Sequence, residues 1–138
     1  MKRILILSFS PIKTDPRVMR QIRALEARFD LTVAGFGPAP VGNISFHDIG
    51  AARGSLPAKT ARAVALLAGL YEYYYWRSPF VRKTLAAVHS ISFDLIIAND
   101  VVSLPLALQI AQSAPVMLDA HEYSPKEFED LWRWRFFF

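Results

Sequence analysis

The sequence predicts an α/β fold, a Rossmann-like three-layer domain with a parallel sheet between helices. Two observations predict it: short apolar runs rich in branched residues recur along the chain, and helical segments separate one run from the next. The chain has 138 residues, of which 53% are hydrophobic, and this is enough for one domain with its own core. We therefore expect residues 1–138 to form a single domain.

The first half of the chain has the pattern of a β-α-β unit followed by a third strand. Residues 4–9 form a continuous apolar run, typical of a strand buried on both faces of a parallel sheet. Asp15 followed by Pro16 predicts the start of a helix that reaches about Arg28, since Asp caps helices and proline is tolerated at the first helical position. Residues 31–36 resume a strand pattern, and residues 44–49 form a weaker third strand.

The second half continues the alternation. The pattern predicts a helix over 58–76, a second helical stretch over 79–89, a strand over 94–98, a helix over 104–111, a strand over 116–118 and a helix that begins at Pro125. Parallel strands joined by helices present their carboxyl ends at one edge of the sheet, where ligands of such folds bind. Functional residues are therefore expected in the loops at that edge.

Composition excludes several classes of function. The chain has no cysteine, which excludes a thiolate nucleophile, a disulfide framework and a cysteine-based zinc site. No apolar run reaches the roughly 20 residues of a membrane span, and the apolar run at the amino terminus is too short for a signal peptide. We expect a cytoplasmic protein.

The formal net charge of +4 is concentrated in the middle of the chain, where Arg53 to Lys83 includes six basic residues and one acid. The aromatic run within this segment has two interpretations. It is a core or interface helix, or it contacts an anionic membrane surface at the inner face of the membrane, with rings at the headgroup level and cations on the lipid. The candidates for membrane contact are Trp76, Arg77, Arg82 and Lys83. A nucleic-acid platform fits the run less well, and no nucleic-acid partner is expected.

Polar residues follow three of the predicted strands. They are Ser10 and Asp15 after the first, Asn99 and Asp100 after the fourth, and Asp119, His121 and Glu122 after the last. The loop after the first strand has neither a GxGxxG nor a GxxxxGK[ST] motif, which disfavours a dinucleotide or P-loop site. His121 and Glu122 lack the spacing of an HExxH motif, so no metal is expected.

Some of these residues have a structural alternative to a functional role. Asp15 is interpreted first as a helix cap. Arg17 is either a solvated helix residue or a ligand clamp, and Asp100 either caps the helix near Leu104 or contacts substrate.

Three short motifs in order, Asp15-Pro16-Arg17-Val18, Asn99-Asp100 with Leu104-Pro105, and Asp119-Ala120-His121-Glu122, resemble the amino-terminal domain of GT4-type glycosyltransferases. The resemblance spans the whole chain and implies the acceptor-side half of a GT-B fold. Such an enzyme moves a sugar, with retention of configuration, from a nucleotide-sugar donor to an acceptor such as a glycan or a lipid-linked sugar. The resemblance implies no cofactor, because the nucleotide sugar is a substrate.

The resemblance also implies roles for individual residues. His121 would be catalytic, and the residues that would bind substrate are Ser10, Asp15, Arg17, Asn99, Asp100, Asp119 and Glu122. The donor would be bound by a carboxy-terminal domain, and nothing in residues 1–138 matches that domain's acidic motif. Many relatives carry paired glycines after the first strand, whereas this chain has Ser10-Pro11-Ile12-Lys13-Thr14, a departure that affects close backbone approach to a donor phosphate.

Two other functions stay open. One is a stand-alone α/β module that binds a glycan, a nucleotide or a protein without turnover. The other is a metal-dependent hydrolase built around Asp100, Asp119, His121 and Glu122. The chain ends in Phe136-Phe137-Phe138, which favours an incomplete chain or a partner surface, and we expect the fragment to be inactive alone and to self-associate.

Overall fold

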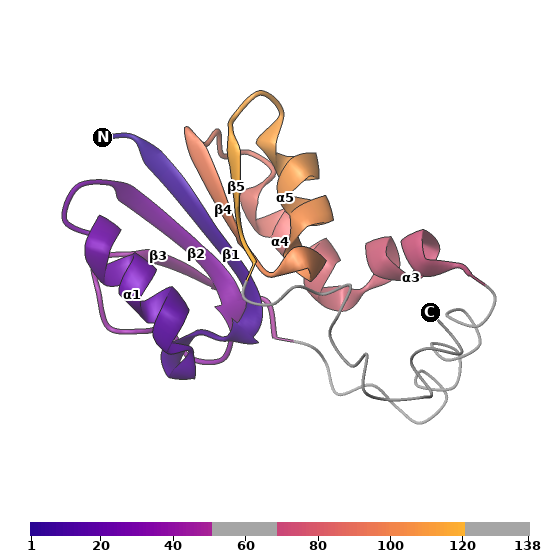
Figure 1. Cartoon of the computed structure of the whole chain (residues 1–138), viewed down its shortest axis with the longest axis horizontal. Helices are drawn as coiled ribbons and strands as arrows, with labels where there is room; N and C mark the ends of the chain where they lie inside the picture. Colours follow the sequence, from indigo (N-terminus) through magenta and orange to yellow (C-terminus); the bar gives the residue numbers. More distant parts are fainter. Residues whose placement is uncertain (51–68, 121–138) are drawn as a thin grey trace.

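A computed structural model of the chain describes residues 1–50 and 69–120 (Figure 1). Its centre is a parallel sheet of five strands in the order β3-β2-β1-β4-β5. The strands are β1 (Arg3–Pro11), β2 (Asp30–Phe36), β3 (Ser45–Asp48), β4 (Leu95–Asn99) and β5 (Val116–Asp119). The predicted Rossmann-like α/β arrangement is therefore confirmed.

Helices cover both faces of the sheet and complete three layers (Figure 1). Helix α1 (Pro16–Leu25) lies on one face, and α4 (Pro79–Val88) and α5 (Leu104–Ala111) lie on the other. Helix α3 (Tyr71–Arg77) precedes α4 and extends beyond the sheet. Two short 3-10 turns, η1 (Ile12–Thr14) and η2 (Val101–Ser103), follow β1 and β4.

The alternation of side chains along β1 explains why the sheet needs both helical layers. Ile4 and Ile6 are buried in the cluster beneath α1, whereas Leu5 and Leu7 are buried in the cluster beneath α4 and α5. Successive side chains of a strand point to opposite faces, so a run without polar residues requires cover on both sides. Full burial of each such side chain stabilises the fold by about 1.5–3 kcal/mol.

The strand order reverses at β1. The chain first builds β2 and β3 on one side of β1 and then places β4 and β5 on its other side. The loops that follow β1 and β4 consequently lead to helices on opposite faces, and a crevice at such a reversal is the usual ligand site of open α/β sheets.

Three predicted helices have different bounds in the structure. The helix predicted over 79–89 ends one residue earlier, at Val88. Helix α1 ends at Leu25, before the predicted Arg28, and a turn follows in which the Arg28 N–H donates to the Leu25 carbonyl over 3.0 Å. The helix predicted over 58–76 is not continuous. Gly69 has a φ of 69°, which a right-handed helix does not accommodate, and α3 begins at Tyr71. Residues 58–68 and the helix predicted from Pro125 lie outside the described residues.

Across residues 1–50 and 69–120, none of the helices has both the length and the apolar character that crossing a membrane requires.

Candidate functional site

The register of the sheet brings polar residues of three neighbouring strands into one row. Ser8 of β1 pairs with Asn99 of β4, and Asn99 pairs with Asp119 of β5. Ile6 precedes Ser8 by two residues and Ile97 precedes Asn99 by two residues. Both isoleucines are buried beneath α1. Because side chains two apart on a strand share a face, the row lies on the α1 side of the sheet, at its carboxyl edge.

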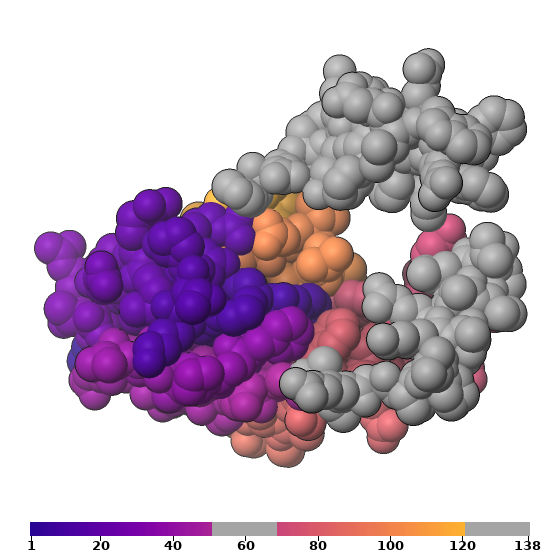
Figure 2. Space-filling model, turned by 90° about the horizontal axis from the view of Figure 1, so that it is seen from below, coloured from indigo at the N-terminus to yellow at the C-terminus, as the bar shows by residue number. Residues whose placement is uncertain are grey.

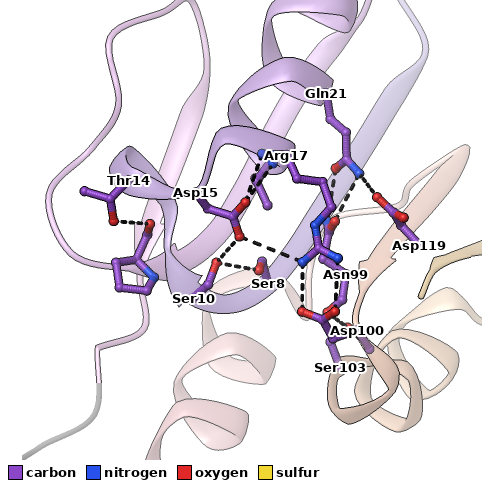
Figure 3. A network of polar contacts seen from close by, with 12 residues as sticks. Ser8, Ser10, Thr14, Asp15, Arg17, Gln21, Asn99, Asp100, Ser103 and Asp119 are labelled. Atoms are coloured by element: carbon purple, nitrogen blue, oxygen red, sulfur yellow. Dashed lines mark hydrogen bonds and ion pairs between the residues drawn. The ribbon is translucent and has the colours of Figure 1, made fainter. Parts of the chain in front are cut away.

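Figure 2 views the molecule from the edge at which the strands end in Figure 1, and there the indigo segment after β1 lies against the orange segment that carries η2 and α5. The two loops of the strand reversal therefore meet at the surface. The prediction that polar strand ends converge is confirmed for Ser10, Asp15, Asn99, Asp100 and Asp119 (Figure 3). Their side chains form two neighbouring sets of polar contacts, which backbone groups of Asn99, Asp100 and Asp119 join.

Helix α1 supplies the side chains that face this row. Asp15 caps the helix, because its Oδ1 accepts hydrogen bonds from the backbone N–H groups of Arg17 at 3.0 Å and Val18 at 3.2 Å. The predicted cap is confirmed. Pro16 occupies the first helical position, where its missing N–H costs nothing. Arg17 and Gln21 are four residues apart and thus share one face of the helix, which is turned toward β4.

Arg17 forms a bidentate ion pair with Asp100. Arg17 Nη1 lies 3.0 Å from Asp100 Oδ1, and Nη2 lies 2.9 Å from Oδ2. The Arg17 side chain is only 16% exposed, so the interpretation of Arg17 as a solvated helix residue is wrong. The hydrogen bonds with Asp100 raise the pKa of Arg17 against the opposing effect of burial, helped by the negative charges of Asp100, Asp15 and Asp119. The pair joins the two loops of the strand reversal.

Asp100 does not cap a helix. It stands before η2, but its carboxylate makes no capping hydrogen bond there and instead binds Arg17. Its backbone has φ 69° and ψ 152°, a region that favours glycine and costs other residues about 1–3 kcal/mol. The Asp100 N–H donates to the Asp119 carbonyl at 3.0 Å, and Ser103 Oγ donates to the carbonyls of Asn99 and Asp100 at 2.7 and 2.9 Å. These bonds hold the strained conformation in place.

A second set of contacts joins α1 to β4 and β5. Gln21 Nε2 donates to Asn99 Oδ1 at 3.0 Å and to Asp119 Oδ2 at 2.6 Å, while Asn99 Nδ2 donates to Gln21 Oε1 at 3.1 Å. Asn99 is fully buried, so these bonds satisfy an amide that would otherwise be costly to bury. Gln21 is not among the residues predicted from the sequence. Its spacing of four residues from Arg17, on the helix that follows β1, is the signal that could have found it.

The third part of the network holds Asp15. Ser8 Oγ and Ser10 Oγ lie 2.8 Å apart, and Ser10 Oγ donates to Asp15 Oδ2 at 2.8 Å. Burial alone would raise the pKa of Asp15. The hydrogen bonds from Ser10 and from the backbone N–H groups of Val18 and Arg17, together with the Arg17 charge, outweigh burial and lower that pKa. Asp15 is therefore a carboxylate at neutral pH.

The negative charges of three carboxylates, Asp15, Asp100 and Asp119, act on the guanidinium of Arg17. Groups of this kind accept hydrogen bonds from hydroxyl groups of a ligand. Asp119 Oδ1 accepts no hydrogen bond from residues 1–50 and 69–120, whereas both oxygens of Asp15 and of Asp100 accept one. Within the same residues, no group of three or more His, Cys, Asp or Glu side chains could hold a metal ion. His121 and Glu122 lie outside the described residues.

Of the residues predicted to contact a membrane, Arg77, Arg82 and Lys83 are exposed, whereas Trp76 is partly buried. Trp76 is half-buried against the core beneath α4 and α5, in edge-to-face contact with Tyr75. Arg77 lies 4.5 Å from the centre of the Tyr73 ring, and Lys83 Nζ donates to the Gly50 carbonyl at 3.0 Å. For Trp76, the interpretation as part of a packed helix is the one that the burial supports.

No family model, curated protein or solved structure matched the chain when it was compared with each of the three.

Proposed function

We propose that this chain is the acceptor-side domain of a retaining glycosyltransferase, which moves a sugar from a nucleotide-sugar donor to a glycan or lipid-linked acceptor. The observation that carries the proposal is the convergence of Arg17, Asp100, Asn99 and Asp119 at the reversal of strand order. These residues belong to the motifs on which the resemblance to GT4-type enzymes rests.

The amino terminus of α1 supports an acceptor site rather than a donor site in this half of the enzyme. In dinucleotide-binding domains, the first helix after β1 directs unpaired N–H groups at a phosphate. Here the Asp15 carboxylate already accepts hydrogen bonds from the N–H groups of Arg17 and Val18. A phosphate at that position would lose these donors and would be repelled by the Asp15 charge. The donor diphosphate is therefore assigned to a separate carboxy-terminal domain.

Asp119 and His121 have complementary roles in this proposal. Asp119 Oδ1 accepts a hydrogen bond from a hydroxyl of the acceptor, and the Gln21 amide holds the other carboxylate oxygen in place. By the resemblance, His121 lies against the reacting sugar and stabilises a transition state of oxocarbenium character. Interactions that strengthen in the transition state increase turnover.

Two experiments test the proposal. The chain of residues 1–138 is titrated calorimetrically with UDP and GDP, and incubated with their sugar conjugates while released nucleotide is measured. We expect neither saturable binding nor turnover. Saturable binding would favour the stand-alone nucleotide-binding module, and turnover by the chain alone would contradict the assignment.

The second experiment uses the complete enzyme with its donor-binding domain. Asp119→Asn keeps the size of the side chain but removes its charge, and should lower the transfer rate at least about tenfold. Asp30→Asn is the matched control, because Asp30 is an exposed carboxylate at the amino-terminal start of β2, far from the strand ends. Equal rates in the two variants would exclude a role for the Asp119 carboxylate in transfer.

A further inference from the structure

A cavity with a volume of about 630 Å³ lies beside the polar network, on the other face of β1. Phe9 stands between Ser8 and Ser10 in the strand, so its ring faces α4 whereas the two hydroxyls face α1. The described residues that line the cavity come from β1, β2, α3, α4 and the segment after β4: Phe9, Phe36, Tyr71, Glu72, Tyr74, Tyr75, Trp76, Ser78, Phe80, Val102 and Pro105. Its volume suits a small organic ligand.

Two hydroxyl groups of the lining are already engaged within the protein. Tyr75 Oη donates to the Val102 carbonyl at 2.8 Å and accepts from the Leu106 N–H at 3.3 Å. Ser78 Oγ donates to the Tyr74 carbonyl at 3.0 Å. A sugar or nucleobase that bound the Tyr75 and Ser78 hydroxyls would have to replace these bonds, which is costly out of water.

Three phenylalanine rings form a packed apolar wall. The centre of the Phe9 ring lies 4.6 Å from that of Phe80 and 6.4 Å from that of Phe36, and the Phe36 and Phe80 centres are 6.1 Å apart. Rings held against one another in this way present a fixed hydrophobic surface. Glu72 is the one ionisable carboxylate in the described lining, and its charge disfavours an anionic group near it.

We propose that this cavity binds an uncharged hydrocarbon chain, such as an alkyl or isoprenyl chain. Such a ligand gains from burial against the rings and makes no demand on the hydroxyls that are already bonded. The further identification of this hydrocarbon ligand as the apolar part of a lipid-linked acceptor rests on the proposed function.

Trp76 provides a direct probe of the cavity. The chain has three tryptophans, so the double variant Trp132→Phe, Trp134→Phe leaves Trp76 as the sole fluorescent indole. Titration with 12-bromododecanol should quench Trp76 in a saturable manner, because the heavy atom enters the cavity that the indole lines. Unbrominated dodecanol should compete and restore the fluorescence. Failure of either result would overturn the proposal.

Two single substitutions in η2 separate binding in the cavity from adsorption to the surface. Val102 lines the cavity and is 59% exposed, whereas Val101 is 43% exposed and is not part of the lining. In the tryptophan variant, Val102→Asp should weaken binding about tenfold or more, since it places a charge against the chain, and Val101→Asp should change it by less than about twofold. Equal effects of the two substitutions would overturn the site.

Competition with a sugar completes the test. A high concentration of methyl glucoside should leave the quenching unchanged, and displacement of the brominated chain by the sugar would assign the cavity to a polar ligand instead. The titration needs neither donor nor transfer, so its outcome is independent of the transferase assays. If the protein binds dodecanol but the transferase assays fail, the cavity is still a site for a hydrocarbon chain. Only the identification of that hydrocarbon as part of an acceptor is then contradicted.

Discussion

Asp100 combines a strained backbone with a paired carboxylate, and replacement by glycine and by alanine separates the two. With φ 69° and ψ 152°, the position costs a residue other than glycine about 1–3 kcal/mol. The ion pair with Arg17 offsets part of this cost. Arg17 is 16% exposed and Asp100 is 40% exposed, so the bidentate pair is worth about 1–2 kcal/mol, between an exposed and a buried pair.

The two variants should therefore differ in stability. Both lose the pair with Arg17, but glycine also relieves the strain while adding about 0.5–1 kcal/mol of backbone freedom to the unfolded chain. These contributions nearly cancel, and we expect Asp100→Gly to unfold within about 1 kcal/mol of wild type. Alanine keeps its Cβ and hence the strain, so Asp100→Ala should be destabilised by about 1–2 kcal/mol, below the glycine variant.

The assay is urea unfolding at pH 7 followed by circular dichroism, with free energies from linear extrapolation. Gln112 is the matched control, because its φ is also positive, at 50°, and its side chain carries no charge. Gln112→Gly should be at least as stable as Gln112→Ala. If Asp100→Ala proves as stable as Asp100→Gly, the strain argument is refuted. If Asp100→Gly keeps its stability while transfer by the complete enzyme falls, the carboxylate has a role in function in addition to its ion pair.

Three further predictions concern pH, catalysis and the membrane. The pKa of Asp15 lies below its ordinary value of 3.8 in the folded chain, so its carboxylate stabilises the fold above that pH and the stabilisation is lost as the pH falls through the folded-state pKa. Asp15→Asn keeps a capping oxygen, so urea unfolding below about pH 4 should show a steeper loss in wild type, and parallel curves would contradict this. His121→Ala in the complete enzyme should lower kcat by roughly 10² with stability changed by less than about 1 kcal/mol, whereas early melting with normal turnover would rule out a catalytic role. Neutralising Arg77, Arg82 and Lys83 together should weaken a salt-sensitive binding to anionic vesicles, as measured by cosedimentation, and unchanged binding would exclude this surface.

Much of the fold was predictable because its signals are local. The continuous apolar run of β1 requires cover on both faces of a sheet, and Asp15-Pro16 carries both a capping oxygen and a proline suited to the first helical position. Strand ends in a parallel sheet share one edge, so the sequence order alone predicted that Asp15, Asn99 and Asp119 would converge. Each of these inferences needs only neighbouring residues and the general geometry of strands and helices.

The partners of the polar residues could not be predicted in the same way. The pair of Arg17 with Asp100 joins residues 83 positions apart, and the bond from Gln21 to Asp119 joins residues 98 positions apart. The strand order and the register in which β1 pairs with β4 bring these distant residues together. Neither can be read from the local sequence pattern. For this reason Asp100 was open to interpretation as a helix cap, and Gln21 was not selected.

The aromatic cavity shows the same division. From the sequence, the run from Tyr71 to Trp76 predicted either a packed helix or a membrane contact, because both place rings and cations together. The tertiary structure decided that Trp76 and Tyr75 pack beside Phe9 and Phe80, which belong to distant parts of the chain. A cavity exists only where several elements pack incompletely against one another. The sequence determined which residues are apolar and where the strands end, and the packing of helices on the sheet decided which of them enclose a space.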